Sequence, residues 1–210
     1  MKRILVVDDH AVVRRGLKQI LSDSLDVVEV NEAKDGDEAV AQVQKTKHDL
    51  VLLDISLPDR TGLDVLKDLK AIRPELPVLM LSIHAEELFA IRALKAGASG
   101  YLTKACPPEE LILAIRKVMT GEKYVSANFA QRLISNLDKN NQKLPHQTLS
   151  DREYQVMCLI SQGKTPKQIA NQLKVSIKTV STYHSRMLEK MKMESNAEIT
   201  RYCLEHELIE

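Results

Sequence analysis

The feature that most constrains the fold is a repeated alternation of short apolar runs with stretches of helical spacing. The apolar runs occupy 3–7, 27–31, 49–53 and 77–81, and a shorter one covers 99–102. Runs that are apolar at consecutive positions are typical of strands buried on both faces of a parallel sheet. Between them, apolar residues recur every three or four positions, as on one face of a helix. We therefore expect an α/β domain built on a doubly wound, five-stranded parallel sheet.

The strand pattern stops after Gly121, which indicates a change of domain. A helix-like stretch covers 126–137, and the polar segment DKNNQKLPHQ then predicts a linker that ends near Pro145. The expected organisation has three segments: a first domain over 1–122, a connecting helix and linker over 123–147, and a second domain over 148–210.

The second domain shows only helical patterns, so we expect it to be small and all-α. Helices are predicted over 151–161, 165–173, 176–191 and 195–207. Ser150 precedes the first helix and Glu153 follows three residues later, as in a capping box. The second and third helices are separated by a short turn at Lys174–Val175, which is the spacing of a helix-turn-helix.

The charge of the chain is distributed unevenly although its net value is only +1. Residues 1–125 carry 18 Lys/Arg against 20 Asp/Glu, whereas residues 164–192 carry 7 against 1. In the tail, 193–210, the balance returns to 1 against 5. The basic window is a candidate contact surface for a polyanion such as DNA. The alternative is a solvated helix face without a partner.

The cellular context follows from what the sequence lacks. No apolar run approaches the ~20 residues that span a bilayer, and the first residues turn acidic too early for a secretory signal. The three cysteines, Cys106, Cys158 and Cys203, are widely spaced and form no CxxC pair. We expect a cytoplasmic protein with no membrane contact, whose thiols are reduced and buried.

Polar residues follow the predicted strands at the edge where an open parallel sheet binds ligands. These residues are Asp8, Asp9, Asp54, Ser82 and Lys104. Three crowded carboxylates repel one another, and a divalent cation such as Mg²⁺ would compensate them. In such a pocket Asp54 could attack a phosphoryl group while Lys104 balances one of its oxygens. The alternative for each residue alone is a helix cap, a loop residue or a surface lysine.

The third helix of the second domain carries two different faces. The apolar stripe that should face the domain consists of Val180, Tyr183, Met187 and Met191. The opposite side carries small polar residues that could approach base edges, namely Ser181, Thr182 and Ser185. Cations that could neutralise phosphates are Lys167, Lys178, Arg186 and Lys190.

Four motifs of the first domain carry a family resemblance. The segments VVDDH, LLDISLPDRTG, LMLSIH and ASGYLTK have the order and spacing of a two-component receiver domain over roughly 1–120. The resemblance implies a flavodoxin-like fold, a phosphoacceptor at Asp54 and a phosphate partner at Lys104. It also implies Mg²⁺ ligands at Asp8, Asp9, Asp54 and the Ser56 carbonyl, and a switch pair formed by Ser82 and Tyr101. Receivers usually carry proline, often after a cis bond, where this chain has Ala105.

The stretch from Leu149 to Met191 resembles a LuxR-type DNA-binding domain, so the whole chain resembles a NarL/FixJ response regulator. The resemblance implies base contacts at Ser181, Thr182 and Ser185, and a dimer contact on the last helix. Family members often carry lysine at position 181 and histidine at position 183. Ser181 and Tyr183 therefore indicate a different target sequence.

These observations predict a phosphorylation-controlled transcription regulator. Its expected partners are a sensor histidine kinase, double-stranded promoter DNA and, after phosphorylation, a second copy of the chain, with RNA polymerase as a further candidate. The chemistry expected at this pocket is modification of the chain's own Asp54, so we do not expect an enzyme. One rival is an aspartate-nucleophile phosphatase, whose nucleophile normally follows the first strand in a DxD arrangement. The other is an output domain that docks on a protein and not on DNA.

Overall fold

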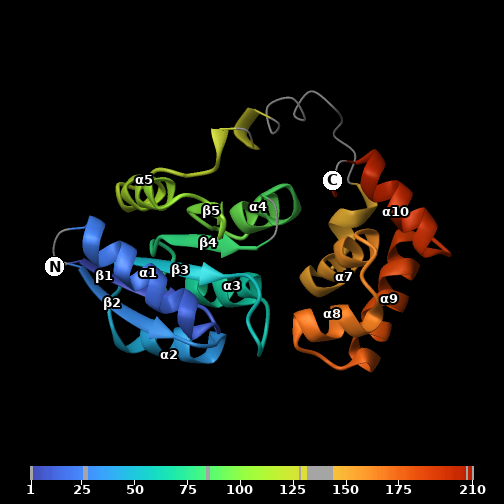
Figure 1. The fold of residues 1–210 in the computed structure, drawn as a ribbon, viewed down its shortest axis with the longest axis horizontal. Coiled ribbons are helices and arrows are strands. Elements are labelled where there is room, and N and C mark those ends of the chain that lie inside the picture. Colours follow the sequence, from blue (N-terminus) through green and yellow to red (C-terminus); the bar gives the residue numbers. More distant parts are fainter. Residues whose placement is uncertain are drawn as a thin grey trace. The chain divides into compact units, whose positions relative to one another are not determined.

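The computed structural model describes residues 2–25, 28–83, 86–127, 129–131, 144–206 and 208–209 of the chain. The chain forms two compact units, Met1–Arg132 and Leu133–Glu210 (Figure 1). Of the helix predicted over 126–137, only 126–127 and 129–131 are described, and most of the predicted linker lies outside the described residues. Within the described part of the chain, no helix is both long and apolar enough to cross a bilayer.

The first unit is built on a five-stranded sheet whose strands are all parallel, in the order β2-β1-β3-β4-β5 (Figure 1). The strands are β1 (Lys2–Val7), β2 (Val28–Ala33), β3 (Leu50–Asp54), β4 (Val78–Ser82) and β5 (Gly100–Thr103). This confirms the predicted doubly wound sheet. Strand β2 ends two residues later than expected because its pairing with β1 continues to Val7 and Ala33.

Helices cover both faces of the sheet, as right-handed crossovers between parallel strands require. Helices α1 (Ala11–Ser24) and α5 (Pro108–Met119) share one core with the sheet, in which Leu21 and Ile115 pack with Ile4 and Leu52. The other face is covered by α2 (Gly36–Lys45), α3 (Gly62–Ile72) and α4 (Glu86–Lys95), which contact one another in that order. Successive residues of a strand point to opposite faces of the sheet, and helices cover both faces. All five residues of β3 are therefore buried.

The segment after α5 covers the free edge of β5, which the sequence did not reveal. The Tyr124 backbone donates to the Ser99 carbonyl and accepts from the Tyr101 amide. Gly100 permits this close approach, because a Cβ there would lie 2.6 Å from the Tyr124 oxygen.

The second unit is entirely helical in its described part, as predicted. It contains the 3₁₀ turn η1 (Pro145–Thr148), α7 (Asp151–Ser161), α8 (Pro166–Leu173), α9 (Ile177–Met191) and α10 (Asn196–Glu205). The last three helices begin one residue later than expected because Thr165, Ser176 and Ser195 have extended backbones and cap the helices with their hydroxyls. The capping box of Ser150 and Glu153 is present.

Helices α8 and α9 form the predicted helix-turn-helix around a small core. The core is made by α7, α8 and α9 and includes Val156, Ile169 and Val180. Lys174 closes α8 in the left-handed conformation, with φ of 54°, and Ser176 caps the start of α9 two residues later. Residues 145–148, which we assigned mostly to the linker, are held to α10 by His146, whose Nδ1 lies 2.9 Å from the Tyr202 hydroxyl.

Candidate functional sites

Three predicted pocket residues meet at the carboxyl edge of the sheet. Asp8 directly follows β1, Asp54 ends β3 and Lys104 follows β5. The Lys104 Nζ lies 2.6 Å from Asp8 Oδ2 and 2.7 Å from Asp54 Oδ2. Both carboxylates are almost fully buried. A single ammonium group therefore joins two carboxylates that come from different strands.

The pairing of β4 with β5 holds Lys104 in this position. Ser82 pairs with Thr103, and the Lys104 amide donates to the Ser82 carbonyl at 2.7 Å. Ser82 and Tyr101, the predicted switch pair, are both completely buried. The peptide bond between Lys104 and Ala105 is trans, since the described residues include no cis bond.

The electrostatics of the pocket are dominated by burial. Burial raises the pKa of Asp54, and Asp8 adds to this effect, while Lys104 and a hydrogen bond from the Ser56 backbone oppose it. Ligand atoms of Asp8, Asp9, His10 and Asp54 all lie within 4.8 Å of one another. Carboxylate oxygens in excess over the single lysine are the donor set that suits a hard divalent cation. The residues present therefore fit Mg²⁺.

Two residues that shape the pocket were not assigned a role from the sequence. His10 places its Nδ1 2.8 Å from Asp9 Oδ1, and its amide donates to Asp8 Oδ1 at 2.7 Å. Arg14 donates from Nη1 to the Asp8 carbonyl at 2.7 Å. The signal was available, because His10 directly follows the aspartates and Arg14 stands about one helical turn later.

Gly62 allows the loop after β3 to fold back against the backbone of Asp54. Its amide donates to the Ile55 carbonyl at 2.8 Å, and a Cβ at this position would lie 2.0 Å from the Asp54 carbonyl oxygen. We expect Gly62→Ala to lower the free energy of unfolding by about 3 kcal/mol, because the strand end must move. Urea unfolding of the full chain measures the change.

Gly16→Ala is the matched control for this prediction. Gly16 lies within α1 and nothing lies within 4 Å of the position that its Cβ would take. Alanine there should stabilise the protein by roughly 0.5–1 kcal/mol, because it improves helix propensity without a clash. Equal effects of the two substitutions would contradict the proposed close approach at Gly62.

The exposed face of α9 presents the predicted base-reading residues. Lys178, Ser181, Thr182, Ser185 and Arg186 are all exposed, as is Lys167 on α8. The three hydroxyls donate to the carbonyl four residues earlier, each at 3.1 Å. Their oxygens keep lone pairs toward solvent, and each hydroxyl can rotate to meet a donor or an acceptor.

Among the described residues, Lys190 is the predicted cation that forms an ion pair inside its own unit. Its Nζ lies 2.6 Å from Glu153 Oε2, and the same oxygen accepts the Ser150 amide at 2.8 Å. Burial alone would raise the pKa of Glu153, but the bonds from Lys190 and Ser150 hold it below its usual value. The pair joins the end of α9 to the start of α7.

Glu153→Gln should therefore weaken the second unit and change its response to pH. Because the folded pKa of Glu153 is lowered, its stabilisation is present above the ordinary carboxyl pKa and is lost as pH falls through the folded value. We expect a loss of about 1–3 kcal/mol at pH 7 that shrinks on acidification. Thermal unfolding at several pH values measures it, with the exposed Glu189→Gln as control. Parallel pH profiles for wild type and Glu153→Gln would refute the role of this carboxylate.

An acidic pocket at the carboxyl edge of a five-stranded parallel sheet, followed by an exposed helix-turn-helix, defines the class of two-domain response regulators. Residues 4–116 match the response regulator receiver domain, and residues 147–203 match the bacterial regulatory proteins of the luxR family. The chain therefore belongs to the two-component response regulators of the NarL/FixJ type, with a receiver domain and a LuxR-type DNA-binding domain.

Individual relatives match over almost their full lengths. The chain is 34% identical to the response regulator UvrY of Escherichia coli over 209 residues, covering 99% of this chain and 96% of UvrY. It is 37% identical to the oxygen regulatory protein NreC of Staphylococcus aureus over 215 residues, covering 99% of each. A solved LuxR-family two-component response regulator from Aurantimonas matches with a TM-score of 0.61 and 32% identity, over 65% of this chain and 98% of that one.

Proposed function

We propose that Asp54 accepts a phosphoryl group from a sensor histidine kinase, and that the phosphorylated chain dimerises and binds double-stranded promoter DNA. The observation that carries this proposal is the buried pair of Asp8 and Asp54 joined through Lys104, at 2.6 and 2.7 Å. A carboxylate at the end of a central strand, with a cation beside it, is suited to receive an anionic group.

The transfer itself is a displacement at phosphorus. An Oδ atom of Asp54 attacks the phosphorus of a phosphohistidine, so that a P–O bond forms while the P–N bond breaks and the imidazole nitrogen keeps the electron pair. Lys104 favours the ionised, nucleophilic form of Asp54 and then pairs with a phosphoryl oxygen. Mg²⁺, when held by Asp8, Asp9, Asp54 and the Ser56 carbonyl, supplies further positive charge to the phosphoryl oxygens.

The phosphoryl group would be sensed by the neighbouring strands. Ser82 ends β4 beside the pocket, and Tyr101 lies on the adjacent strand β5, where it pairs with Met80. A phosphoryl oxygen that accepts a hydrogen bond from Ser82 draws the hydroxyl inward and leaves space that favours the inward position of Tyr101, which is the buried position seen in this structure. A small local change thereby biases the surface of the receiver between two states.

The output belongs to the second unit. Lys167, Lys178 and Arg186 would neutralise DNA phosphates, while Ser181, Thr182 and Ser185 would contact base edges in the major groove. Lys190 contributes charge near the same face but is held by Glu153. The helix from Ser195 through Cys203 would join two copies on paired half-sites, and RNA polymerase is a further candidate partner.

The test of phosphoryl acceptance is the intact mass of the full chain after incubation with acetyl phosphate and Mg²⁺, followed by sizing. We expect one phosphoryl group and a shift to dimers for the wild type and neither for Asp54→Asn. Asp37→Asn is the control, because its side chain is 85% exposed and lies on α2. An adduct that survives Asp54→Asn would remove Asp54 from its role, and steady hydrolysis of small phosphate esters would favour a phosphatase.

A further inference from the structure

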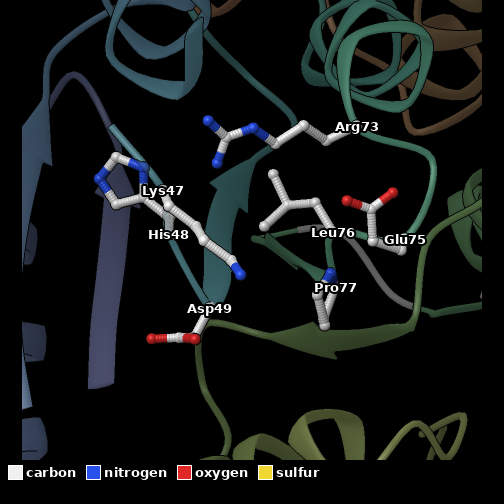
Figure 2. A pocket seen from close by; sticks show the side chains of 7 residues that line it. All are labelled: Lys47, His48, Asp49, Arg73, Glu75, Leu76 and Pro77. Atoms are coloured by element: carbon white, nitrogen blue, oxygen red, sulfur yellow. The ribbon is translucent and has the colours of Figure 1, made fainter. Parts of the chain in front are cut away.

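A cavity lined mainly by ionisable residues lies at the amino edge of the receiver sheet, so that strand β3 separates it from Asp54. Its volume is about 280 Å³, and it is lined by residues 47–49, which precede β3, and by the turn between α3 and β4 (Figure 2). None of the residues assigned to phosphoryl transfer or DNA binding lies here. The cavity therefore needs its own explanation.

His48 lines this cavity and is only 3% exposed. Its Nε2 lies 3.1 Å from Asn31 Oδ1, while Asn31 Nδ2 donates to Glu29 Oε1 at 3.3 Å. Glu29 is fixed in turn by Arg3, whose Nε lies at 2.8 Å. Since the Asn31 oxygen can only accept, Nε2 of His48 carries the proton. In the neutral ring, Nδ1 is then the unprotonated nitrogen.

Arg73 faces the same cavity from the end of α3. Figure 2 shows its guanidinium group directed toward the His48 ring. Among the described residues, Arg73 Nη1 and His48 Nδ1 are buried side-chain atoms that make no hydrogen bond of normal geometry, although the Thr46 backbone acts on the His48 ring. Buried polar atoms are satisfied in nearly all native proteins, so the Arg73 Nη1 donor indicates a missing acceptor at this cavity. His48 Nδ1 becomes a second donor to that acceptor once the ring is protonated.

We propose that this cavity binds a small oxyanion, either a carboxylate or a phosphate or sulfate group, which accepts hydrogen bonds from Arg73 Nη1 and from a protonated His48 Nδ1. The exposed Lys47 adds positive charge at the rim. Of the two acidic lining residues, Asp49 already accepts the Arg3 amide at 2.8 Å, and Glu75 is exposed to solvent, which screens its charge. The volume suits a ligand smaller than a typical drug molecule.

Binding should take up a proton. Burial and the Arg73 guanidinium lower the pKa of His48, with a smaller contribution from Arg3, whereas Glu29 and the Thr46 backbone oppose the effect. An anion beside Nδ1 reverses this balance, because it favours the charged imidazolium. The affinity for the anion should therefore rise as pH falls from 7.5 toward 6.

The test uses the full chain, titrated with sulfate and separately with acetate at pH 6.0 and 7.5 and constant ionic strength. The ring nitrogen resonances of His48, assigned with His48→Gln, are followed by NMR. We expect saturable protonation of Nδ1, with tighter binding at the lower pH. Arg73→Gln should weaken binding about tenfold or more, and Glu75→Gln should strengthen it. A preference for sulfate points to a phosphate or sulfate group as the natural ligand, and a preference for acetate points to a carboxylate.

Lys45→Gln is the control, because it removes one exposed positive charge from α2 outside the cavity. Unchanged formation of the Asp54 adduct reports that each variant is folded. The proposal is overturned if neither anion changes the His48 resonances, which would mean that the cavity holds only water. It is also overturned if Arg73→Gln binds as tightly as wild type. Neither result would affect the proposed chemistry at Asp54.

Discussion

Lys104→Met is expected to slow phosphoryl transfer to Asp54 by a factor of about 10² or more. The ammonium group contacts both Asp8 and Asp54, which are 1% and 2% exposed, so its removal leaves two buried carboxylates without their cation. Burial and Asp8 raise the pKa of Asp54, and without Lys104 less would oppose them, so a larger share of Asp54 would be protonated and a poor nucleophile. The phosphoryl group would also lose its positive partner.

The same substitution should lower the free energy of unfolding by about 3 kcal/mol in Mg²⁺-free buffer, because breaking a buried ion pair leaves an uncompensated charge. Added Mg²⁺ should restore part of this loss. Rates of adduct formation and urea unfolding measure both effects, and Lys67→Met serves as control because its side chain is 55% exposed. A Lys104→Met protein that is phosphorylated at the wild-type rate would exclude Lys104 from the reaction.

Replacing Lys178 and Arg186 together by glutamine is expected to remove most of the measurable DNA affinity at 0.2 M salt. Each cation that neutralises a phosphate releases counterions, so the slope of log affinity against log salt should decrease by about 2 for the pair. Fluorescence anisotropy on labelled duplex DNA over a range of salt concentrations gives the slope. Both side chains are exposed, so the fold should be unaffected.

Lys190→Met provides the comparison within the same helix. Because Lys190 is bound to Glu153, its loss should reduce the stability of the second unit and change the salt slope by less than the loss of either Lys178 or Arg186. A slope that the double variant leaves unchanged would mean that these residues do not face DNA. It would favour an output domain that docks on a protein.

The sequence predicted the sheet and its acidic edge because parallel strands impose a simple rule. The central strands β3 and β4 are apolar until they reach the carboxyl edge, and β1 is apolar from Ile4 onward, so polar residues such as Asp8 and Asp54 meet at that edge. Three helices begin one residue later than the sequence predicted, after Thr165, Ser176 and Ser195. Each of these capping residues fits the helical sequence pattern but has an extended backbone.

Pairings between distant residues could not be read from periodicity. The spacing of α9 put Lys190 on a polar side of the helix but gave no indication that Glu153, 37 residues earlier, binds it. Likewise, His48 stands in a short polar segment before β3, and periodicity gives no indication that it is buried. Its burial follows from the packing of β1, β2 and the α3–β4 turn around it. Cys106 was expected to be buried and is only partly so.

The most direct test of the central claim is the affinity of the full chain for DNA with and without acetyl phosphate and Mg²⁺. The probe is a duplex enriched from a random-sequence library by the phosphorylated protein. We predict that phosphorylation tightens wild-type binding by a factor between about 5 and 150 and leaves Asp54→Asn unchanged. Equal wild-type affinity in both conditions, despite a confirmed phosphoryl adduct, would contradict the account.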